Sequence, residues 1–283
     1  MRKLFVILLM ICYVGAYAQE TMYEGRLHED ILSLRWGGMW QYDQYLSPLR
    51  YDGQFIAVQN EWWTSFDLRK ARNEELRLQN SECDWSHVGK VKIQGARLYN
   101  DAYTNMIYAL GAQGGWGAHY DFSRMMGVDG LHLFIGPYLD VDLLGKELIN
   151  NVNKPYSIDL CMDVKAHAGL SYSFSGKRTS YRVRYTAMTS LMGAQFVPEY
   201  GQSYYEVSEG IIGGAIGFSS VHNHLTIRQE LTMDFQFPHS AWRLGVEHEY
   251  IRHHMNNLDF QREQVSLVVG CVFNYKTHIV KMK

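Results

Sequence analysis

Residues 225–237 read LTIRQELTMDFQF, in which every even position is polar and every odd position except Gln229 is apolar. A period of two predicts a β-strand with one apolar face and one polar face. At least five other segments repeat this alternation at similar length. A series of such strands is typical of a transmembrane β-barrel, which turns its apolar face to lipid and its polar face to the lumen.

The N-terminus has the three parts of a secretory signal peptide. Arg2 and Lys3 precede an apolar run, and small residues follow it at a cleavage site that ends in Ala18. We therefore expect a signal peptide over residues 1–18 and a single barrel domain over residues 19–283, located in the outer membrane of a Gram-negative bacterium. The mature chain has no run of 18 or more apolar residues. An integral protein of this sequence must then be a closed barrel, because only closure satisfies strand backbone groups in lipid.

The sequence predicts an all-β, antiparallel transmembrane barrel. The composition of 25 glycines, 5 prolines and 20 tyrosines suits strands with tight turns and aromatic girdles. An even strand number is required when both ends of the chain lie on one side of the membrane. Because the alternation marks only eleven segments, we place another strand in residues 69–84 or 203–209 and expect twelve strands, with ten as the alternative. The eleven segments are residues 31–41, 54–67, 87–98, 104–121, 128–143, 156–175, 179–194, 211–221, 224–237, 240–252 and 260–275.

Strand parity predicts a lumen that is densely charged with both signs. Opposite charges at short range pair, so we expect an occluded lumen with a continuous charge network rather than an open pore. A soluble barrel of the lipocalin type also alternates, but it places its apolar face inside. The expected lumen residues are Asp140, Asp142, Asp159, Asp163, Lys165, Arg182, Arg184, Arg228, Glu230, Asp234, Arg243, Glu247 and Glu249.

The charge balance gives no basis for nucleic-acid binding. The signal peptide carries two of the 27 basic residues and none of the 29 acidic ones, so the mature net charge is -4. The expected partners are outer-membrane lipid and other envelope proteins. Three mature cysteines, Cys83, Cys161 and Cys271, are interpreted as small apolar side chains; parity places Cys161 and Cys271 on opposite faces, so these two are not expected to pair.

No catalytic residue, metal site or cofactor is predicted. An outer-membrane phospholipase or deacylase of the expected kind needs a His-x-Ser pair on one strand face, and none occurs among the 12 histidines. An omptin-like protease needs paired acids and an Asp-x-His pair; Asp140 and Asp142 supply only the first half, and pairing with Arg182 and Arg184 explains them structurally. The histidine pairs at 222/224 and 253/254 fall at predicted turns, where solvated histidines are common.

Residues 190–206, SLMGAQFVPEYGQSYYE, carry the most specific local motif. This segment resembles the hallmark of a family of predicted outer-membrane proteins from the Bacteroidetes, catalogued as a domain of unknown function. Residues 45–53 (YLSPLRYDG) and two tripeptides, 243–245 and 256–258, are similar as well. The resemblance implies a compartment and an architecture, and it brings no catalytic residue with it.

Residues 198–206 depart most from simple alternation. Their acids and tyrosines predict a rim or an inward-folded loop that serves closure of the fold or contact with a partner. We expect a non-enzymatic barrel with a structural or accessory role, as a subunit of an envelope complex; the alternatives are an enzyme acting on lipid or peptide at the rim and a narrow channel. The candidate rim residues are Glu199, Tyr200, Gln202, Tyr204, Tyr205 and Glu206.

Overall fold

The computed structural model of the 283-residue chain describes a barrel wall and most of its turns. The described residues are 26–66, 85–122, 128, 130–149, 151, 155–176, 179–200, 202, 204, 206, 209–210, 214–237 and 240–277. The expected signal peptide, Cys83 and Tyr205 lie outside these residues.

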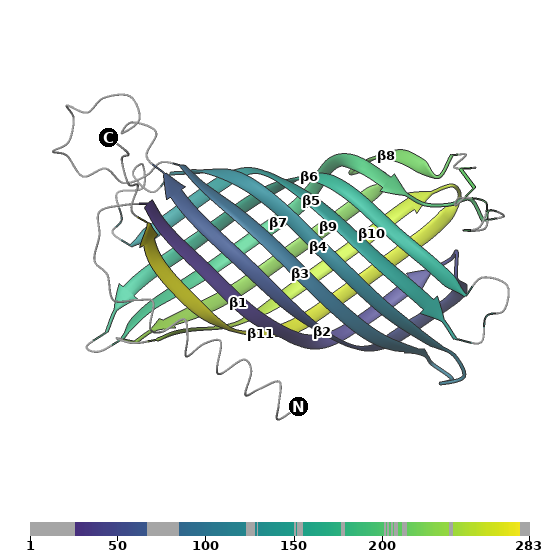
Figure 1. Cartoon of the computed structure of the whole chain (residues 1–283), viewed down its shortest axis with the longest axis horizontal. Helices are drawn as coiled ribbons and strands as arrows, with labels where there is room; N and C mark the ends of the chain where they lie inside the picture. Colours follow the sequence, from purple (N-terminus) through teal and green to yellow (C-terminus); the bar gives the residue numbers. More distant parts are fainter. Residues whose placement is uncertain are drawn as a thin grey trace.

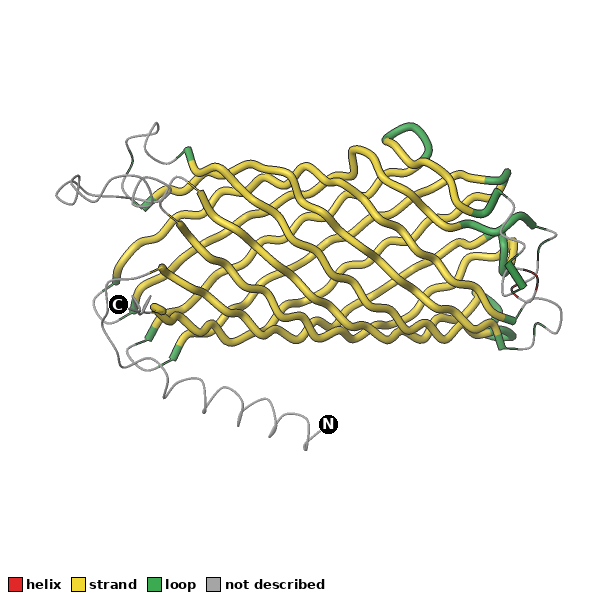
Figure 2. The backbone as a smooth tube through the Cα atoms, turned by 45° about the horizontal axis from the view of Figure 1, so that its top comes forward, coloured by secondary structure: helices red, strands yellow, loops and turns green. Residues whose placement is uncertain are grey.

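Eleven antiparallel strands occur in the described residues, one in each segment that the alternation marked. Figures 1 and 2 show long, strongly tilted strands wrapped around one axis. The strands are β1 (Arg26–Asp43), β2 (Ser47–Phe66), β3 (Trp85–Asn100), β4 (Met106–Asp121), β5 (Leu131–Leu148), β6 (Tyr156–Ser175), β7 (Ser180–Phe196), β8 (Ile216–Ser220), β9 (His224–Gln236), β10 (Ala241–Met255) and β11 (Leu258–Thr277).

Ten of these strands close into a ring. Each pairs with its neighbour in chain order except that β7 pairs with β9, and β1 pairs with β11 to close the barrel. Arg26 lies opposite Thr277, so the first strand begins beside the end of the last one (Figure 1). We call this the proximal end; the opposite end, where β1 turns into β2, is the distal end.

The expectation of twelve strands is wrong for the described wall, and ten, the alternative, is observed. The segment predicted at residues 211–221 shrinks to the five-residue β8, which pairs with the last residues of β7 outside the ring. Five residues are too few to span a membrane, for which about 9–11 are needed. The wall has an even number of strands because β8 lies outside it, and not because a twelfth strand is added. Residues 69–84 lie outside the described ranges.

Side chains alternate between the outer surface and the lumen as parity predicts. On β9, Leu231 is 47% exposed, whereas Thr232 is 3% exposed and Asp234 is fully buried. The same alternation places Leu139 and Val141 outside and Asp140 inside on β5. The register that the sequence predicts for these strands is thus correct, and their polar face is the lumen.

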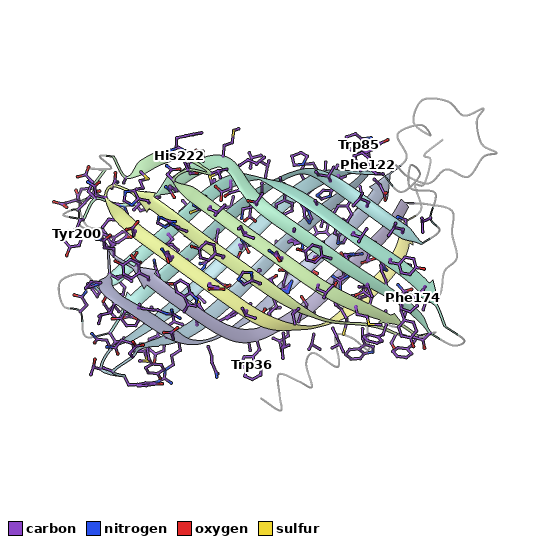
Figure 3. All side chains as sticks on the ribbon, turned by 180° about the vertical axis from the view of Figure 1, so that it is seen from behind. Trp36, Trp85, Phe122, Phe174, Tyr200 and His222 are labelled. Atoms are coloured by element: carbon purple, nitrogen blue, oxygen red, sulfur yellow. The ribbon has the colours of Figure 1, made fainter. Side chains whose placement is uncertain are left out.

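The outer surface has an aliphatic belt between two groups of aromatic side chains. On β4, Tyr108 and Tyr120 bracket an outward series that includes the exposed Leu110 and Trp116. At the proximal end, stacked and edge-on rings join Tyr172, Phe174, Tyr181 and Phe235, and Figure 3 shows Phe174 and Trp85 there. Trp36 points away from the barrel in the same view. An apolar belt flanked by aromatic girdles is the surface pattern of membrane barrels.

The hairpin between β10 and β11 has the tightest distal turn. Met255 pairs with Leu258, and the two residues between them, Asn256 and Asn257, have φ values of 53° and 57°. Two-residue hairpins of type I′ need positive φ at both central positions, and asparagine tolerates this conformation better than most residues. The Asn-Asn pair therefore fixes the register of these two strands at the distal end.

The two described cysteines differ in state. Cys161 is a free thiol, whereas Cys271 is disulfide-bonded, so its partner is not Cys161. The interpretation of Cys271 as an unpaired small side chain is therefore wrong, although the expectation that these two do not pair is confirmed. Among the described residues, no helix is long and apolar enough to cross a membrane.

The facing of β9 can be tested with Leu231→Arg and the matched control Leu231→Phe. A lipid-facing arginine near the membrane midplane costs roughly 2–4 kcal/mol, so Leu231→Arg should lower the folded fraction in lipid vesicles, while Leu231→Phe should fold normally. The folded fraction is measured by the gel mobility of unboiled samples. Normal folding of the arginine variant would contradict the outward placement of Leu231.

Candidate functional site: the charged lumen

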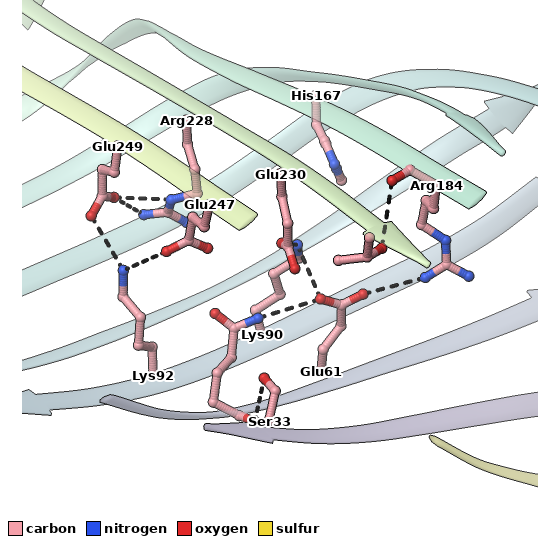
Figure 4. A network of polar contacts seen from close by, with 12 residues as sticks. Ser33, Glu61, Lys90, Lys92, His167, Arg184, Arg228, Glu230, Glu247 and Glu249 are labelled. Carbon is pink, nitrogen blue, oxygen red and sulfur yellow. Dashed lines mark hydrogen bonds and ion pairs between the residues drawn. The ribbon is translucent and has the colours of Figure 1, made fainter. Parts of the chain in front are cut away.

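Charged side chains from opposite walls meet in the middle of the lumen (Figure 4). The Nζ atom of Lys90 on β3 lies 3.1 Å from a carboxylate oxygen of Glu61 and 3.5 Å from one of Glu230 on β9. Lys92 on β3 similarly contacts Glu249 at 3.2 Å and Glu247 at 3.6 Å, both on β10. Strand β3 neighbours neither β9 nor β10 in the ring. These ion pairs therefore cross the lumen.

Arg35 on β1 extends this bridge. One guanidinium nitrogen lies 3.3 Å from Glu230 and 3.5 Å from Glu247. Arg228 pairs with Glu249, which Arg262 also approaches at 3.9 Å. The charged heads of the lysines, arginines and glutamates thus form a continuous layer across the barrel. All of these side chains are at least 94% buried.

Towards the proximal end the layer continues around two glutamates. Glu29 accepts hydrogen bonds from Arg182 at 2.5 Å and Arg184 at 2.9 Å. Arg243 donates to both carboxylate oxygens of Asp234, at 2.6 and 3.0 Å. Arg184 and Arg243 each lie 3.5 Å from Glu61, which joins this group to Lys90. Bidentate arginine–carboxylate contacts of this kind fix orientation as well as charge.

Three further pairs lie apart from this layer. Lys165 contacts Asp140 at 2.5 Å, and Gln113 also donates to Asp140 at 3.0 Å. Lys146 lies between Asp43 and Asp159, 2.6 Å from the latter. Asp163 contacts His224 at 2.8 Å.

Twelve of the thirteen expected lumen residues therefore have an oppositely charged partner in the described lumen, and Asp163 lies within hydrogen-bonding distance of His224. Ion pairs within 4.0 Å connect nine of them into one network, with Glu29, Arg35, Glu61, Lys90, Lys92 and Arg262 as links. The nine are Asp142, Arg182, Arg184, Arg228, Glu230, Asp234, Arg243, Glu247 and Glu249.

Five of the six links lie on β1, β2 and β3, whereas the lumen residues were predicted only from β5 onward; the sixth, Arg262, lies on β11 and was missed as well. Arg35 on β1 lies between the apolar Leu34 and Trp36, and Lys90 and Lys92 share one face of β3. Glu29 has polar neighbours on both sides and lies before the strand expected at residues 31–41. The same parity rule would have found Arg35, Lys90 and Lys92. The expected contact of Asp140 and Asp142 with Arg182 and Arg184 is wrong, because Asp140 pairs with Lys165 and Asp142 pairs with Arg262 at 2.6 Å.

The proximal part of the lumen is filled by rings. His119 and His167 are fully buried, and their ring nitrogens lie 2.7 Å apart. Trp63 packs against both imidazoles and against Phe134, while the Arg184 guanidinium lies 4.8 Å from the centroid of the Trp63 ring. Aromatic groups thus fill the lumen beside the proximal end of the charged layer, where Trp63 lies opposite Glu29 in the sheet.

The distal part of the lumen is filled by an apolar cluster. Its members come from the inward faces of β1 to β5, from the distal turns and from the start of β11, and Tyr204 and Met255 pack against it. The buried members are Met39, Tyr45, Leu46, Tyr51, Phe55, Ala57, Leu98, Ile107, Ala109, Leu144, Leu148, Val197 and Leu258. In small barrels, inward side chains of this kind pack against one another in the interior.

The candidate rim segment contributes to this closure through two of its residues. Tyr45 donates from its hydroxyl to the Gln202 carbonyl at 2.9 Å, and its ring meets that of Tyr204 edge-on, with centroids 5.8 Å apart. The hydroxyl of Tyr204 accepts from the backbone N–H of Ile158 at 2.6 Å. Tyr200 is 61% exposed and lies at the distal end in Figure 3, and Glu199 and Glu206 are exposed too. Tyr205 lies outside the described residues.

Burial of these two tyrosines changes their ionisation. Desolvation, together with the nearby Tyr204, Asp43 and Glu206, raises the pKa of Tyr45 to about 12. Desolvation also raises the pKa of Tyr204, although its hydrogen bond to Ile158 opposes the shift. Both phenols therefore remain neutral hydrogen-bonding groups at physiological pH.

His224 and His253 are buried in the lumen, at 2% and 4% exposure, so their interpretation as solvated turn residues is wrong. The Nε2 atom of His224 contacts both Asp163, at 2.8 Å, and the Thr226 hydroxyl, at 3.2 Å. A catalytic triad needs the acid and the hydroxyl on different imidazole nitrogens, so this pair does not form one. Within the described residues, no group of three or more histidine, cysteine or acidic side chains could hold a metal ion.

A family model described as "Protein of unknown function (DUF3316)" matches residues 4–282. The chain belongs to this family. No curated protein matches the sequence significantly. The resemblance in residues 190–206 also indicated a family of unknown function, and the family match agrees with it on that point.

Several solved barrel structures are similar to this chain at low identity. The translocator domain of the autotransporter NalP from Neisseria meningitidis is 10% identical, with a TM-score of 0.39 and 93% of each chain covered. The transport unit of the autotransporter AIDA-I from Escherichia coli is 6% identical, with a TM-score of 0.41, covering 95% of this chain and 97% of that one. The outer membrane protease OmpT from Escherichia coli is also 6% identical, with a TM-score of 0.41 and coverage of 90% and 99%. At these values no activity carries over.

The distal closure can be tested with Tyr204→Phe and the control Tyr200→Phe. The first substitution removes the hydroxyl that bonds to Ile158 while keeping the ring, so we expect a loss of about 0.5–1.5 kcal/mol in the free energy of unfolding. The exposed Tyr200 should show little change. Both are measured by denaturant titration of the folded barrel in lipid vesicles, and equal effects would mean that Tyr204 is a passive turn residue.

Proposed function

We propose that this protein is an outer-membrane β-barrel with an occluded lumen and a structural or accessory role in the envelope, as a subunit of a larger complex. The observation that carries this proposal is the layer of ion pairs that crosses the lumen, in which Lys90 joins Glu61 to Glu230. A barrel filled in this way offers neither a conducting path nor a free interior site.

The membrane location is supported by the outer surface. Exposed aliphatic side chains such as Leu231, Leu244 and Leu267 cover the wall between aromatic residues at the two ends. On β4, eleven residues separate the girdle tyrosines Tyr108 and Tyr120, which is close to the length that a tilted strand needs to span the hydrocarbon core. A soluble barrel would have to expose this surface to water.

The occlusion is supported at three levels of the lumen. Rings around Trp63 occupy the proximal part, the ion-pair layer crosses the middle, and an apolar cluster with Phe55 and Leu144 fills the distal part. Within the described residues, the Asp163–His224 pair lacks a separate hydroxyl on its other imidazole nitrogen. These features favour a non-enzymatic role over the alternatives of a rim enzyme and a narrow channel.

Three elements of the proposal come from the sequence. Cleavage near Ala18 would release the mature barrel into the periplasm for insertion, and the motif in residues 190–206 favours an origin in the Bacteroidetes. The proposed partners are outer-membrane lipid and other envelope proteins, and the mature net charge of -4 gives no basis for nucleic-acid binding. The exposed Tyr200 at the distal end suits contact with a protein partner, since tyrosine is enriched at such interfaces.

Conductance distinguishes the occluded barrel from the channel. Purified protein in planar bilayers should give no large steady current, because a permeating ion would have to break buried ion pairs. A bacterial porin measured in the same bilayers shows that the assay detects open barrels. A stable channel of nanosiemens size from the purified protein would contradict the proposed occlusion and favour the channel.

A further inference from the structure

A groove of about 1080 Å³ lies on the lipid-facing wall across β2 to β6. Its outward lining includes Ile56, Ile93, Leu110, Leu143 and Ile158, all of them exposed and aliphatic. Its volume is slightly above that of typical small-molecule sites, roughly 300–1,000 Å³. Most of the described wall has large outward side chains, so the hollow needs a local cause.

Two outward glycines make the hollow. Gly95 on β3 and Gly145 on β5 both pair with Leu110 on β4, so they flank this 70% exposed side chain in one row of the sheet. A Cβ atom added at Gly95 would meet its nearest neighbour, a backbone oxygen, at 4.0 Å, and one at Gly145 at 3.8 Å. Both glycines therefore face open space and leave a slot on each side of Leu110.

The edge of the groove nearer the distal end carries polar and aromatic groups. Arg97, Tyr108 and Glu147 each lie one pleat closer to that end than Gly95, Leu110 and Gly145. The Arg97 guanidinium lies 5.0 Å from the Tyr99 ring centroid and 5.9 Å from that of Tyr108. Tyr108 on β4 lies between Arg97 on β3 and Glu147 on β5 in one row of the sheet. Rings and charges at the end of an apolar surface mark the headgroup level of a bilayer.

We propose that this groove is a binding site for a glycerophospholipid with a zwitterionic phosphoethanolamine headgroup. The acyl chains lie in the slots beside Leu110, the phosphate binds Arg97, and the ammonium group binds Glu147. One cation and one anion, on either side of Tyr108, match this headgroup, whereas a lipid with several phosphates requires a cluster of cations. The site rests on the proposed membrane location and is independent of whether the lumen is occluded.

Native mass spectrometry of the full mature barrel tests the site. Detergent-solubilised protein is mixed with equal amounts of phosphatidylethanolamine and phosphatidylglycerol that have the same acyl chains. The expected result is one retained phosphatidylethanolamine, preferred about tenfold, which corresponds to about 1.4 kcal/mol. Equal retention of both lipids, or preference for phosphatidylglycerol, overturns the proposal.

Matched variants locate the bound lipid on the wall. Gly95→Leu combined with Gly145→Leu fills the slots and should reduce retention about tenfold or more. Gly114→Leu is the control. Gly114 lies on the outer face of β4, and a Cβ atom added there would be 4.0 Å from its nearest neighbour, as at Gly95, but Gly114 does not line the groove. Equal retention by the filled and control variants overturns the site.

Charge variants test the headgroup. Glu147→Gln should abolish the preference for phosphatidylethanolamine while leaving total retention high, because only the ammonium contact is lost. Arg252→Gln, which removes an exposed cation from β10 on the far wall, should change neither quantity. A preference unchanged by Glu147→Gln overturns the headgroup assignment.

Two other occupants of the groove would also overturn the proposal. A mass of two barrels that the filled-groove variant loses would assign the face to a second copy of the chain. Exclusive retention of lipid A from a mixed extract would assign it to a multiply phosphorylated lipid. Every sample is first checked for the gel-mobility shift of a folded barrel. Loss of lipid from a folded barrel contradicts only the site. Failure of the unsubstituted protein to form a folded barrel contradicts the proposed function.

Discussion

Ion pairing between walls that are not neighbours in the sheet is the interaction on which the proposed occlusion of the lumen depends. Backbone hydrogen bonds hold neighbouring strands together whatever their side chains are. Those bonds therefore fix only the circumference of the barrel. Lys90 and Lys92, which reach β9 and β10 from β3, decide instead what lies inside it. A barrel of the same strand number with short neutral side chains at these positions would leave the middle of its lumen open.

The energetics of such a layer favour specificity more than stability. Burying an ion costs several kcal/mol, which its partner and additional hydrogen bonds repay only when every charge is matched. In this lumen Arg243 is matched by Asp234, Glu61 and Glu29, and Glu249 is matched by Arg228 and Lys92. A one-residue slip of a strand would turn these charges towards lipid. The network therefore penalises wrong registers strongly, whatever its net contribution to the free energy of folding.

The period-two alternation predicted the fold class, the facing of the strands and the charged lumen residues. The number of wall strands could not be predicted in the same way, because β8 has the pattern of a strand but lies outside the ring and pairs only with β7. Partners also could not be predicted, because Asp140 and Asp142 lie two residues apart on one face yet pair with Lys165 and Arg262 on different strands. Parity gives the face of a side chain, whereas the partner depends on strand tilt and on the length of each side chain. The burial of His224 was missed although β9 begins at this residue, as expected: its even position shares the lumen face with Thr226 and Arg228, but it was assigned to the adjacent turn.

The most direct test of the account is a double-mutant cycle for Lys90 and Glu230, measured at about 0.1 M and about 1 M salt. The variants are Lys90→Met, Glu230→Gln and the two combined, and the free energy of unfolding in lipid vesicles is the observable. A pair buried in an occluded lumen should show a coupling energy of about 0.5–3 kcal/mol that changes little with salt, because buried charges are screened far less than exposed ones. A coupling energy near zero, or one that disappears at the higher salt concentration, would show a water-filled lumen and contradict the account.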